Sequence, residues 1–131
     1  WSVLNRDIEK DLTSVCAENN VGVLPFYPLE MGLLAGKYRR GEGAPAGTRL
    51  DGDARLGSAD FDTLEALEAF AQARGHDLIT LAVSWLASQP VTVSVIAGAT
   101  RYEQMAQNAA AASWKMTGEE LAEIDRIVGA G

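Results

Sequence analysis

The sequence predicts an α/β fold with parallel strands, and three observations support this prediction. Helical and strand-like patterns alternate in the order helix, strand, two helices, strand, two helices. Residues 21–27 and 91–97 are short apolar runs, and the first is nearly unbroken, as is typical of a parallel strand covered on both faces. Helical segments separate the two runs, so right-handed crossovers between parallel strands are expected.

The first helix is expected over residues 5–19, with Asn5 as its N-cap and Asn19-Asn20 as its end. Apolar side chains recur along it at helical spacing, at Ile8, Leu12, Val15 and Cys16. Because Cys16 lies on this apolar stripe, we expect a buried small hydrophobe rather than a nucleophile. Residues 1–4 look like the end of a further strand.

The strand at 21–27 contains Pro25, which lacks a backbone donor, so part of this strand is expected to be irregular or unpaired. Residues 30–60 hold most of the glycine and proline and are expected to form a long excursion loop. Loops of this length in compact domains are usually functional or disordered.

The remaining helices carry clear end signals. A helix over 61–74 ends at Gly75, and the next, over 77–88, starts at the N-cap Asp77 and ends before Pro90. After the strand at 91–97, capping boxes are expected at Thr100/Glu103 and Thr117/Glu120, starting helices over 101–111 and 117–128. Trp85 and Trp114 are expected in the core, and His76 on the polar surface.

Composition narrows the function classes. The 131 residues carry a formal net charge of −7, which disfavours binding to nucleic acid or to an anionic membrane surface. No apolar run approaches the roughly 20 residues of a membrane span. A lone Cys16 and a single His76 allow neither an internal disulfide nor a structural metal cluster. We expect one cytoplasmic domain without metal.

The turn in "VIAGATRYEQMAQN", residues 95–108, is a candidate anion site. An apolar run stops at Gly98 and passes directly into a helix, whose first N–H groups are unpaired and carry partial positive charge. Gly98 would let the backbone approach a ligand closely. The Thr100 hydroxyl could bond a phosphate oxygen or simply cap the helix, and the residues alone leave both interpretations open.

Five of the eleven cations fall between residues 37 and 55, at Lys37, Arg39, Arg40, Arg49 and Arg55. Such a local excess suits a loop that folds over a dinucleotide, because charge-assisted bonds to phosphate are strong. A solvated loop can have the same composition.

Several separated motifs resemble one family. "GVLPFYPLEMGLLAGKY" (22–38), "GTRL" (47–50) and "VIAGATRYEQMAQNAAA" (95–111), with "LNRDIEKDL" (4–12) and "LAVSWLASQP" (81–90), are similar to the C-terminal half of the aldo-keto reductases. The resemblance implies the C-terminal part of a TIM (β/α)8 barrel, incomplete on its own, with residues 1–131 as the last two-plus strands, the cofactor loop and the C-terminal helices. Two strands cannot close a barrel, so a missing part is expected.

The resemblance also implies cofactor contacts. An aromatic at Phe26 would stack on the nicotinamide, and the loop along the ribose and pyrophosphate would comprise Tyr27, Pro28, Leu29, Met31 and Gly32. Lys37 and Arg49 match cations that clasp the pyrophosphate. The family's positions that hold the adenosine phosphate and adenine match Ile96, Gly98, Thr100, Gln104, Gln107 and Asn108. Arg101 lies where many family members present a polar or basic group near the 2′-phosphate of NADP(H).

The implied activity is NADPH-dependent reduction of an aldehyde or ketone by a full-length barrel. This chain departs from the family at Phe26, Tyr27 and Ala97, where tyrosine, serine and proline are frequent. The family's catalytic Asp, Tyr, Lys and His come from the N-terminal half, so none of them is expected in residues 1–131, and the chain alone is expected to be inactive. Two alternatives are a non-catalytic NADP(H)-binding module and a structural half-barrel that self-associates through open edges.

Overall fold

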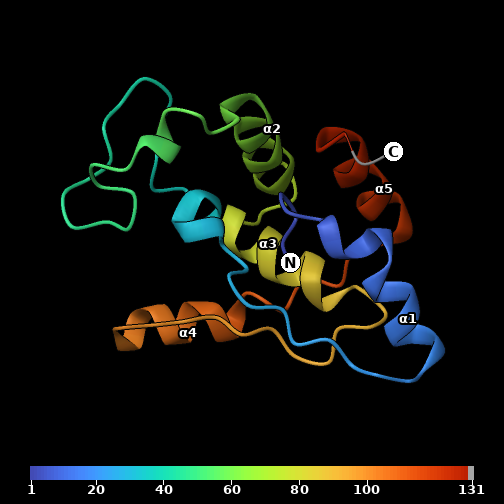
Figure 1. The fold of residues 1–131 in the computed structure, drawn as a ribbon. Helices are drawn as coiled ribbons and strands as arrows, with labels where there is room; N and C mark the ends of the chain where they lie inside the picture. Colours follow the sequence, from blue (N-terminus) through green and yellow to red (C-terminus); the bar gives the residue numbers. More distant parts are fainter. Residues whose placement is uncertain (130–131) are drawn as a thin grey trace.

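The computed structural model describes residues 1–129, in which α3 (Leu78–Ala87) is the central element (Figure 1). Helix α3 is apolar on nearly every side, and such a helix must be enclosed. Accordingly α2 (Phe61–Gln72), α4 (Tyr102–Ala110) and the 3₁₀ segment η2 (Glu30–Ala35) pack against it, and α5 (Gly118–Ile127) packs against α2. The core is formed mainly by α2 and α3, with Val3, Leu34, Trp114 and Ile124 from other segments.

Most of the predicted helix ends are confirmed. Asp77 caps α3 by accepting a hydrogen bond from the Thr80 N–H at 2.7 Å. Thr117 and Glu120 form the expected reciprocal capping box at α5, with bonds of 3.2 and 2.8 Å. Helix α2 ends just before Gly75, whose φ of +77° is left-handed, as the glycine signal predicts.

The prediction of a capping box at Thr100 and Glu103 is wrong. Helix α4 has Arg101 as its N-cap and no side chain caps its start. Instead, the Thr100 N–H and hydroxyl both donate to Gln104 Oε1, at 3.0 and 3.1 Å. The helix therefore begins one residue later, and Glu103 is left exposed in the first turn.

The first helix is broken. A 3₁₀ helix η1 (Asp7–Lys10) is separated from α1 (Leu12–Glu18) at Asp11, whose φ is −150°. Asn5 is not the N-cap, because a turn joins the Ser2 N–H to the Asn5 carbonyl and places Arg6 at the cap. Of the expected stripe, Cys16 is buried, whereas Leu12 and Val15 are about half exposed. The end at Asn19 is confirmed.

The predicted strands at 21–27 and 91–97 are not formed as regular strands. Two isolated parallel bridges join these segments, Val23 with Thr92 and Phe26 with Ile96. Between the bridges the first segment advances three residues and the second four, and Pro25 has no N–H, so a continuous ladder cannot form. The parallel course is as predicted, and the two segments run side by side (Figure 1).

The segment 21–27 is not covered on both faces, contrary to the prediction, and the segment 91–97 is exposed as well. Leu24 and Val93 are 54% and 69% exposed. In residues 1–129 no third segment is bridged to this pair. Residues 1–4 are also not a strand. There Ser2 and Val3 are fully buried and the Trp1 ring packs edge-on against Trp85, with 5.7 Å between ring centroids.

The segment 30–60 is an excursion loop, as predicted, but two short 3₁₀ pieces, η2 and η3 (Ala54–Leu56), interrupt it. It is anchored to the protein by Leu34, Tyr38 and Leu50, which are all buried. Between these anchors the chain projects away from the helices (Figure 1).

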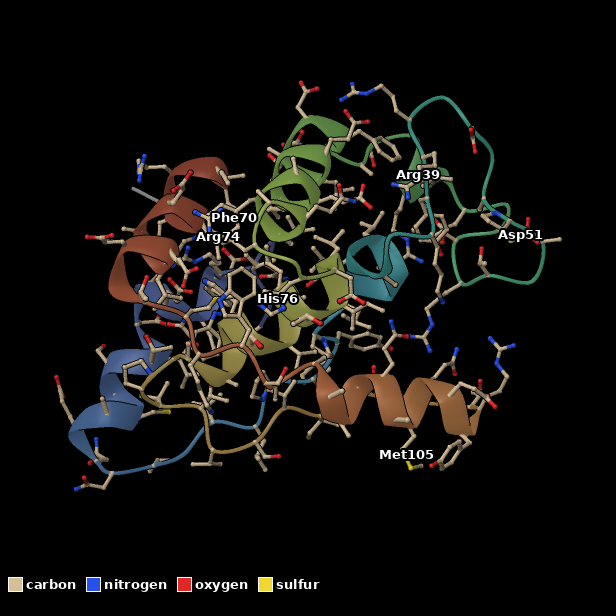
Figure 2. The ribbon with its side chains drawn as sticks, turned by 180° about the vertical axis from the view of Figure 1, so that it is seen from behind. Arg39, Asp51, Phe70, Arg74, His76 and Met105 are labelled. Atoms are coloured by element: carbon tan, nitrogen blue, oxygen red, sulfur yellow. The ribbon has the colours of Figure 1, made fainter. Side chains whose placement is uncertain are left out.

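The sequence predicts His76 on the polar surface, but the structure places it partly under neighbouring groups. It is half-buried and its ring stacks on Trp114, with centroids 4.3 Å apart and an angle of 16°. Beside it Arg74 lies over Phe70 at 3.7 Å, and the group joins the end of α2 to α5 (Figure 2). Trp85 and Trp114 are buried, as predicted.

Candidate functional site

A cleft of about 500 Å³ opens between the segment after Pro25 and the start of α4. One wall comes from residues 26–37, the other from residues 96–104, and Arg49 reaches in from the excursion loop. The bridge between Phe26 and Ile96 holds the two walls together at their base, with the Ile96 N–H donating to the Pro25 carbonyl at 2.9 Å.

The structure brings all but three of the sequence-predicted site residues to this cleft. Those that line it are Phe26, Tyr27, Pro28, Leu29, Met31, Gly32, Lys37, Arg49, Ile96, Gly98, Thr100 and Gln104. They come from segments far apart in the sequence, and the resemblance alone had grouped them. Ala35, Ala97 and Ala99 also line the cleft and were not predicted.

The remaining three predicted residues do not line the cleft. Arg101 is exposed at the N-cap of α4, next to the cleft residue Thr100. The Asn108 side chain donates to the Gly98 carbonyl at 3.3 Å, so it supports the turn at Gly98 without lining the cleft. The Gln107 amide donates to Asp77 at 3.3 Å and thus links α4 to the start of α3.

Asp77 carries a depressed pKa at this link. Partial burial acts to raise the pKa of its carboxyl, but hydrogen bonds from Thr80 and Gln107 favour the carboxylate and lower the pKa below its ordinary value. The group is therefore a structural anion that caps α3.

Two cations of the cleft are unpaired within residues 1–129. Neither Lys37 nor Arg49 forms an ion pair with a carboxylate there, and the Arg49 guanidinium lies 5.4 Å from the centre of the Tyr27 ring. In a chain of net charge −7, two such cations make the cleft locally favourable for an anion.

The other loop cations are neutralised by carboxylates. Arg39 pairs with Glu68 at 2.7 Å, Arg40 with Asp62 and Glu65, and Arg55 with Asp53. The sequence left a phosphate role and a solvated-loop role open for all five cations. The structure divides them, because only Lys37 and Arg49 face the cleft.

The backbone of the cleft is strained in one short turn. Tyr27, Glu30 and Met31 have φ values of +55°, +44° and +53°, a left-handed conformation that non-glycine residues rarely adopt. Each such residue costs on the order of 1–3 kcal/mol, and these outliers cluster at functional sites. Only Gly32, with φ of +96°, gives a sequence signal for this turn, so sequence reasoning missed it.

Gly98 is not required by the protein's own packing. Its φ lies outside the left-handed region, and a Cβ built there would meet no atom of residues 1–129 within 4 Å, its two chain neighbours aside. Gly98 is also one of the residues that line the cleft. A ligand that approaches this backbone would explain the glycine.

The start of α4 is accessible beside this space. Thr100, Arg101 and Tyr102 are exposed, and no side chain caps the helix. Free N–H groups at a helix start favour anions such as phosphate. Phe26, 62% exposed, offers an aromatic face at the other side of the cleft.

A larger cavity of about 660 Å³ lies under the excursion loop, and its one lining cation within residues 1–129, Arg40, is already engaged. Arg40 is paired with Asp62, and Asp60 accepts hydrogen bonds from Thr63 at the N-cap of α2. Among the described residues that line it, this cavity therefore lacks the unpaired cations that the first cleft offers. Among residues 1–129 there is also no group of acidic, His or Cys side chains that could hold a metal ion, and no helix long and apolar enough to cross a membrane.

Comparison with known proteins identifies relatives over the whole described chain. A sequence profile of the Aldo/keto reductase family matches residues 1–128. The L-glyceraldehyde 3-phosphate reductase of Escherichia coli O157:H7 is 34% identical over 142 residues, covering 100% of this chain and 40% of that protein. Probable aldo-keto reductase 1 of Glycine max is 30% identical, covering 100% of this chain and 39% of that protein.

Among solved structures, the glycerol dehydrogenase AKR11B4 from Gluconobacter oxydans superposes with a TM-score of 0.83 at 26% identity. The match covers 99% of this chain and 41% of that one. The chain thus spans about 40% of the length of these relatives.

Proposed function

Because the chain belongs to the aldo-keto reductase family, we propose that its cleft binds NADP(H) and that it contributes the cofactor-binding part of a carbonyl-reducing TIM barrel. Proteins of this family reduce carbonyl compounds and generally use NAD(P)H. Because this chain spans about 40% of the length of its relatives, the carbonyl-reducing activity belongs to the proposal together with the cofactor, its site and the C-terminal place in a barrel.

The observation that carries the proposal is the separation of the loop cations. Lys37 and Arg49 line the cleft without a carboxylate partner among residues 1–129, whereas Arg39, Arg40 and Arg55 are paired elsewhere. Unpaired cations facing an open helix start would attract the phosphates of a dinucleotide. The open space at Gly98 and the exposed ring of Phe26 fit the two ends of such a ligand.

The residues divide the proposed work among themselves. Phe26 would support the nicotinamide, Lys37 and Arg49 would bind the pyrophosphate, and Thr100 with the start of α4 would hold the adenosine phosphate. The cofactor supplies hydride, and the protein orients it.

Titration of the protein with NADPH, followed by nicotinamide fluorescence, tests the proposal. We expect Arg49→Ala to weaken binding about tenfold or more, because a charge-assisted hydrogen bond contributes about 1.5–3 kcal/mol. Arg55→Ala, which removes a cation already paired with Asp53, is the matched control and should leave the affinity unchanged. Equal losses in both variants would contradict the proposed site.

Arg101 separates NADPH from NADH. It is exposed beside Thr100, where it could reach a 2′-phosphate. Arg101→Ala should weaken NADPH more than NADH, because only NADPH carries that phosphate. Equal losses for the two cofactors would show that Arg101 does not read it.

A second candidate function is a non-catalytic, self-associating half-barrel that binds NADP(H) or serves structurally. It is favoured by the large apolar side chains exposed along the two bridged segments, at Val21, Leu24, Phe26, Val93 and Ile96. Exposed apolar side chains and unpaired backbone edges both promote association. Size-exclusion chromatography with light scattering tests this, and a clean monomer at micromolar concentration would contradict it.

A further inference from the structure

The buried Tyr38 hydroxyl joins the two parts of the loop that carry the cleft. It donates to the Met31 carbonyl and accepts from the Leu50 N–H, each at 3.3 Å. Tyr38 is only 6% exposed and does not line the cleft itself. Its hydroxyl therefore connects the strained turn at 27–32 with the residue that follows Arg49.

Arg49 is held between two contacts that both lead back to this turn. At its backbone, the neighbouring Leu50 is 1% exposed and bonded to Tyr38. At its far end, the guanidinium lies over the Tyr27 ring. Tyr27 and Met31 belong to one turn. The two hydrogen bonds of Tyr38 therefore fix the position of the Arg49 backbone relative to the Tyr27 ring, over which the Arg49 guanidinium lies.

The fit around Tyr38 is close. A Cβ at Gly32 would come within 3.4 Å of its hydroxyl. The hydroxyl is thus packed against the turn as well as bonded to it, and a phenylalanine ring could occupy the same space without forming either bond.

We infer that Tyr38 is a positioning residue, which places the Arg49 charge at the cleft by tying Leu50 to the strained turn. The inference rests on the proposed function, because it gives Arg49 an anion to meet. Tyr38 acts through Arg49 and makes no contact with the ligand.

A second buried hydroxyl holds the turn independently. Ser2 is fully buried, and its Oγ donates to Glu30 Oε1 at 2.7 Å while accepting from the Leu4 and Asn5 N–H groups. Removing the Tyr38 hydroxyl should therefore release Arg49 and Leu50 without dismantling the turn. This makes Tyr38→Phe a selective test.

The ligand-free protein gives the first readout. In Tyr38→Phe, NMR should show amide exchange at Leu50 faster by about tenfold or more, because its hydrogen bond is lost, and a changed chemical shift of the Arg49 side-chain N–H, because the guanidinium leaves the Tyr27 ring. Unchanged signals at both positions would overturn the inference.

Ser84→Ala is the matched control for this measurement. Ser84 is also buried, and its hydroxyl likewise donates to one carbonyl, of Ala111 at 2.6 Å, and accepts from one N–H, of Trp114 at 3.2 Å. It lies outside the cleft. The control should speed exchange at the Trp114 amide and leave Leu50 and Arg49 unchanged. A change at Arg49 in the control would also contradict the inference.

NADPH binding gives the second readout, through a double-mutant cycle. Tyr38→Phe alone should weaken binding by about threefold to tenfold. In the Arg49→Ala background it should weaken binding by less than about twofold, because its effect passes through Arg49. Independent, multiplying losses would overturn the inference. If the unchanged protein binds no NADPH, the proposed function fails, and the Leu50 and Arg49 signals still decide the positioning role.

Discussion

Trp85 and Val93 are both apolar and lie only eight positions apart, yet Trp85 is fully buried on α3 whereas Val93 is 69% exposed beside the bridged segments. The same contrast holds for the two sides of the molecule. Helices α2, α3 and α5 enclose a packed core with satisfied caps, and Arg74 at their junction is paired with Glu120 and Glu123. The cleft side combines strained backbone, unpaired cations and exposed apolar side chains.

This difference teaches where the chain buries apolar surface and where it leaves apolar side chains and cations exposed. A core gains free energy from burying apolar surface, roughly 25 cal/mol per Å². The cleft side leaves such surface exposed and holds residues in unfavourable conformations, which is typical of a surface that binds something else. Four predictions test the contrast.

The largest effect is expected at the centre of the core. Trp85→Ala should destabilise the protein by about 3–5 kcal/mol, because it removes a large, fully buried ring from packed surroundings. Urea unfolding followed by circular dichroism measures this. Val93→Ala on the cleft side is the comparison and should cost less than about 0.5 kcal/mol. Similar losses would mean that the two sides do not differ in packing.

On the cleft side, Gly98→Val should act on binding rather than stability. The new side chain meets no protein atom near its Cβ, so the free energy of unfolding should stay nearly constant. NADPH affinity should fall by about tenfold, which corresponds to about 1.4 kcal/mol, because the side chain fills the space proposed for the ligand. Gly118→Ala, also open and without positive φ, is the control. Unchanged affinity would remove the ligand from this turn.

Two threonines with the same sequence signal should differ. Thr117→Ala should destabilise by about 1 kcal/mol, because its hydroxyl caps α5 in a formed capping box. Thr100→Ala should change stability little, because Thr100 does not cap α4 and its hydroxyl bonds only the side-chain oxygen of Gln104. Thermal unfolding of both variants measures the difference. A larger loss at Thr100 would show that the start of α4 is stabilised by that side chain.

The smallest effect concerns acid. The folded-state pKa of Asp77 lies below its ordinary value of 3.8. Its stabilising contribution is therefore complete above about pH 4 and is lost as the pH falls through the depressed value. Asp77→Asn keeps a capping oxygen without a titrating group, so urea unfolding between pH 7 and pH 3 should show a shallower loss of stability. Part of the pH dependence of stability will remain in Asp77→Asn, because Asp53 also has a depressed pKa. Hydrogen bonds from Arg55 lower the pKa of Asp53 to about 2. An unchanged slope would contradict the role of Asp77.

How much the sequence could predict depends on the distance over which each signal acts. Helix ends such as Asp77 and Thr117 are set by residues three positions away, and these predictions are confirmed. The strands at 21–27 and 91–97 need neighbours on both sides and an unbroken register, and neither is written locally, so regular strands were wrongly expected. Leu12 and Val15 have the spacing of a buried stripe, but only a covering element would bury them.

The site shows the same limit. The resemblance grouped residues that the structure mostly brings to one cleft. Of the three that do not line it, Asn108 supports the turn at Gly98, Gln107 links α4 to Asp77, and Arg101 is exposed at the N-cap of α4. The left-handed turn at Tyr27, Glu30 and Met31 has almost no sequence signal, because its conformation is held by distant hydroxyls of Ser2 and Tyr38. From the sequence, His76 is expected on the surface, because the stacking of its ring on Trp114 is a contact between residues far apart in the chain.

Met105, 62% exposed on α4, points away from the rest of the chain (Figure 2).

The anchoring of the excursion loop has one practical consequence. Its tip, from Gly41 to Gly47, projects away from the helices, and at both glycines a Cβ would meet no neighbouring atom. Before the tip, Arg39 and Arg40 are tied to α2, and after it Leu50 is buried and tied to Tyr38. A protease that cuts within this tip would therefore leave a nicked molecule whose two pieces stay together, and the same position would accept an inserted peptide tag.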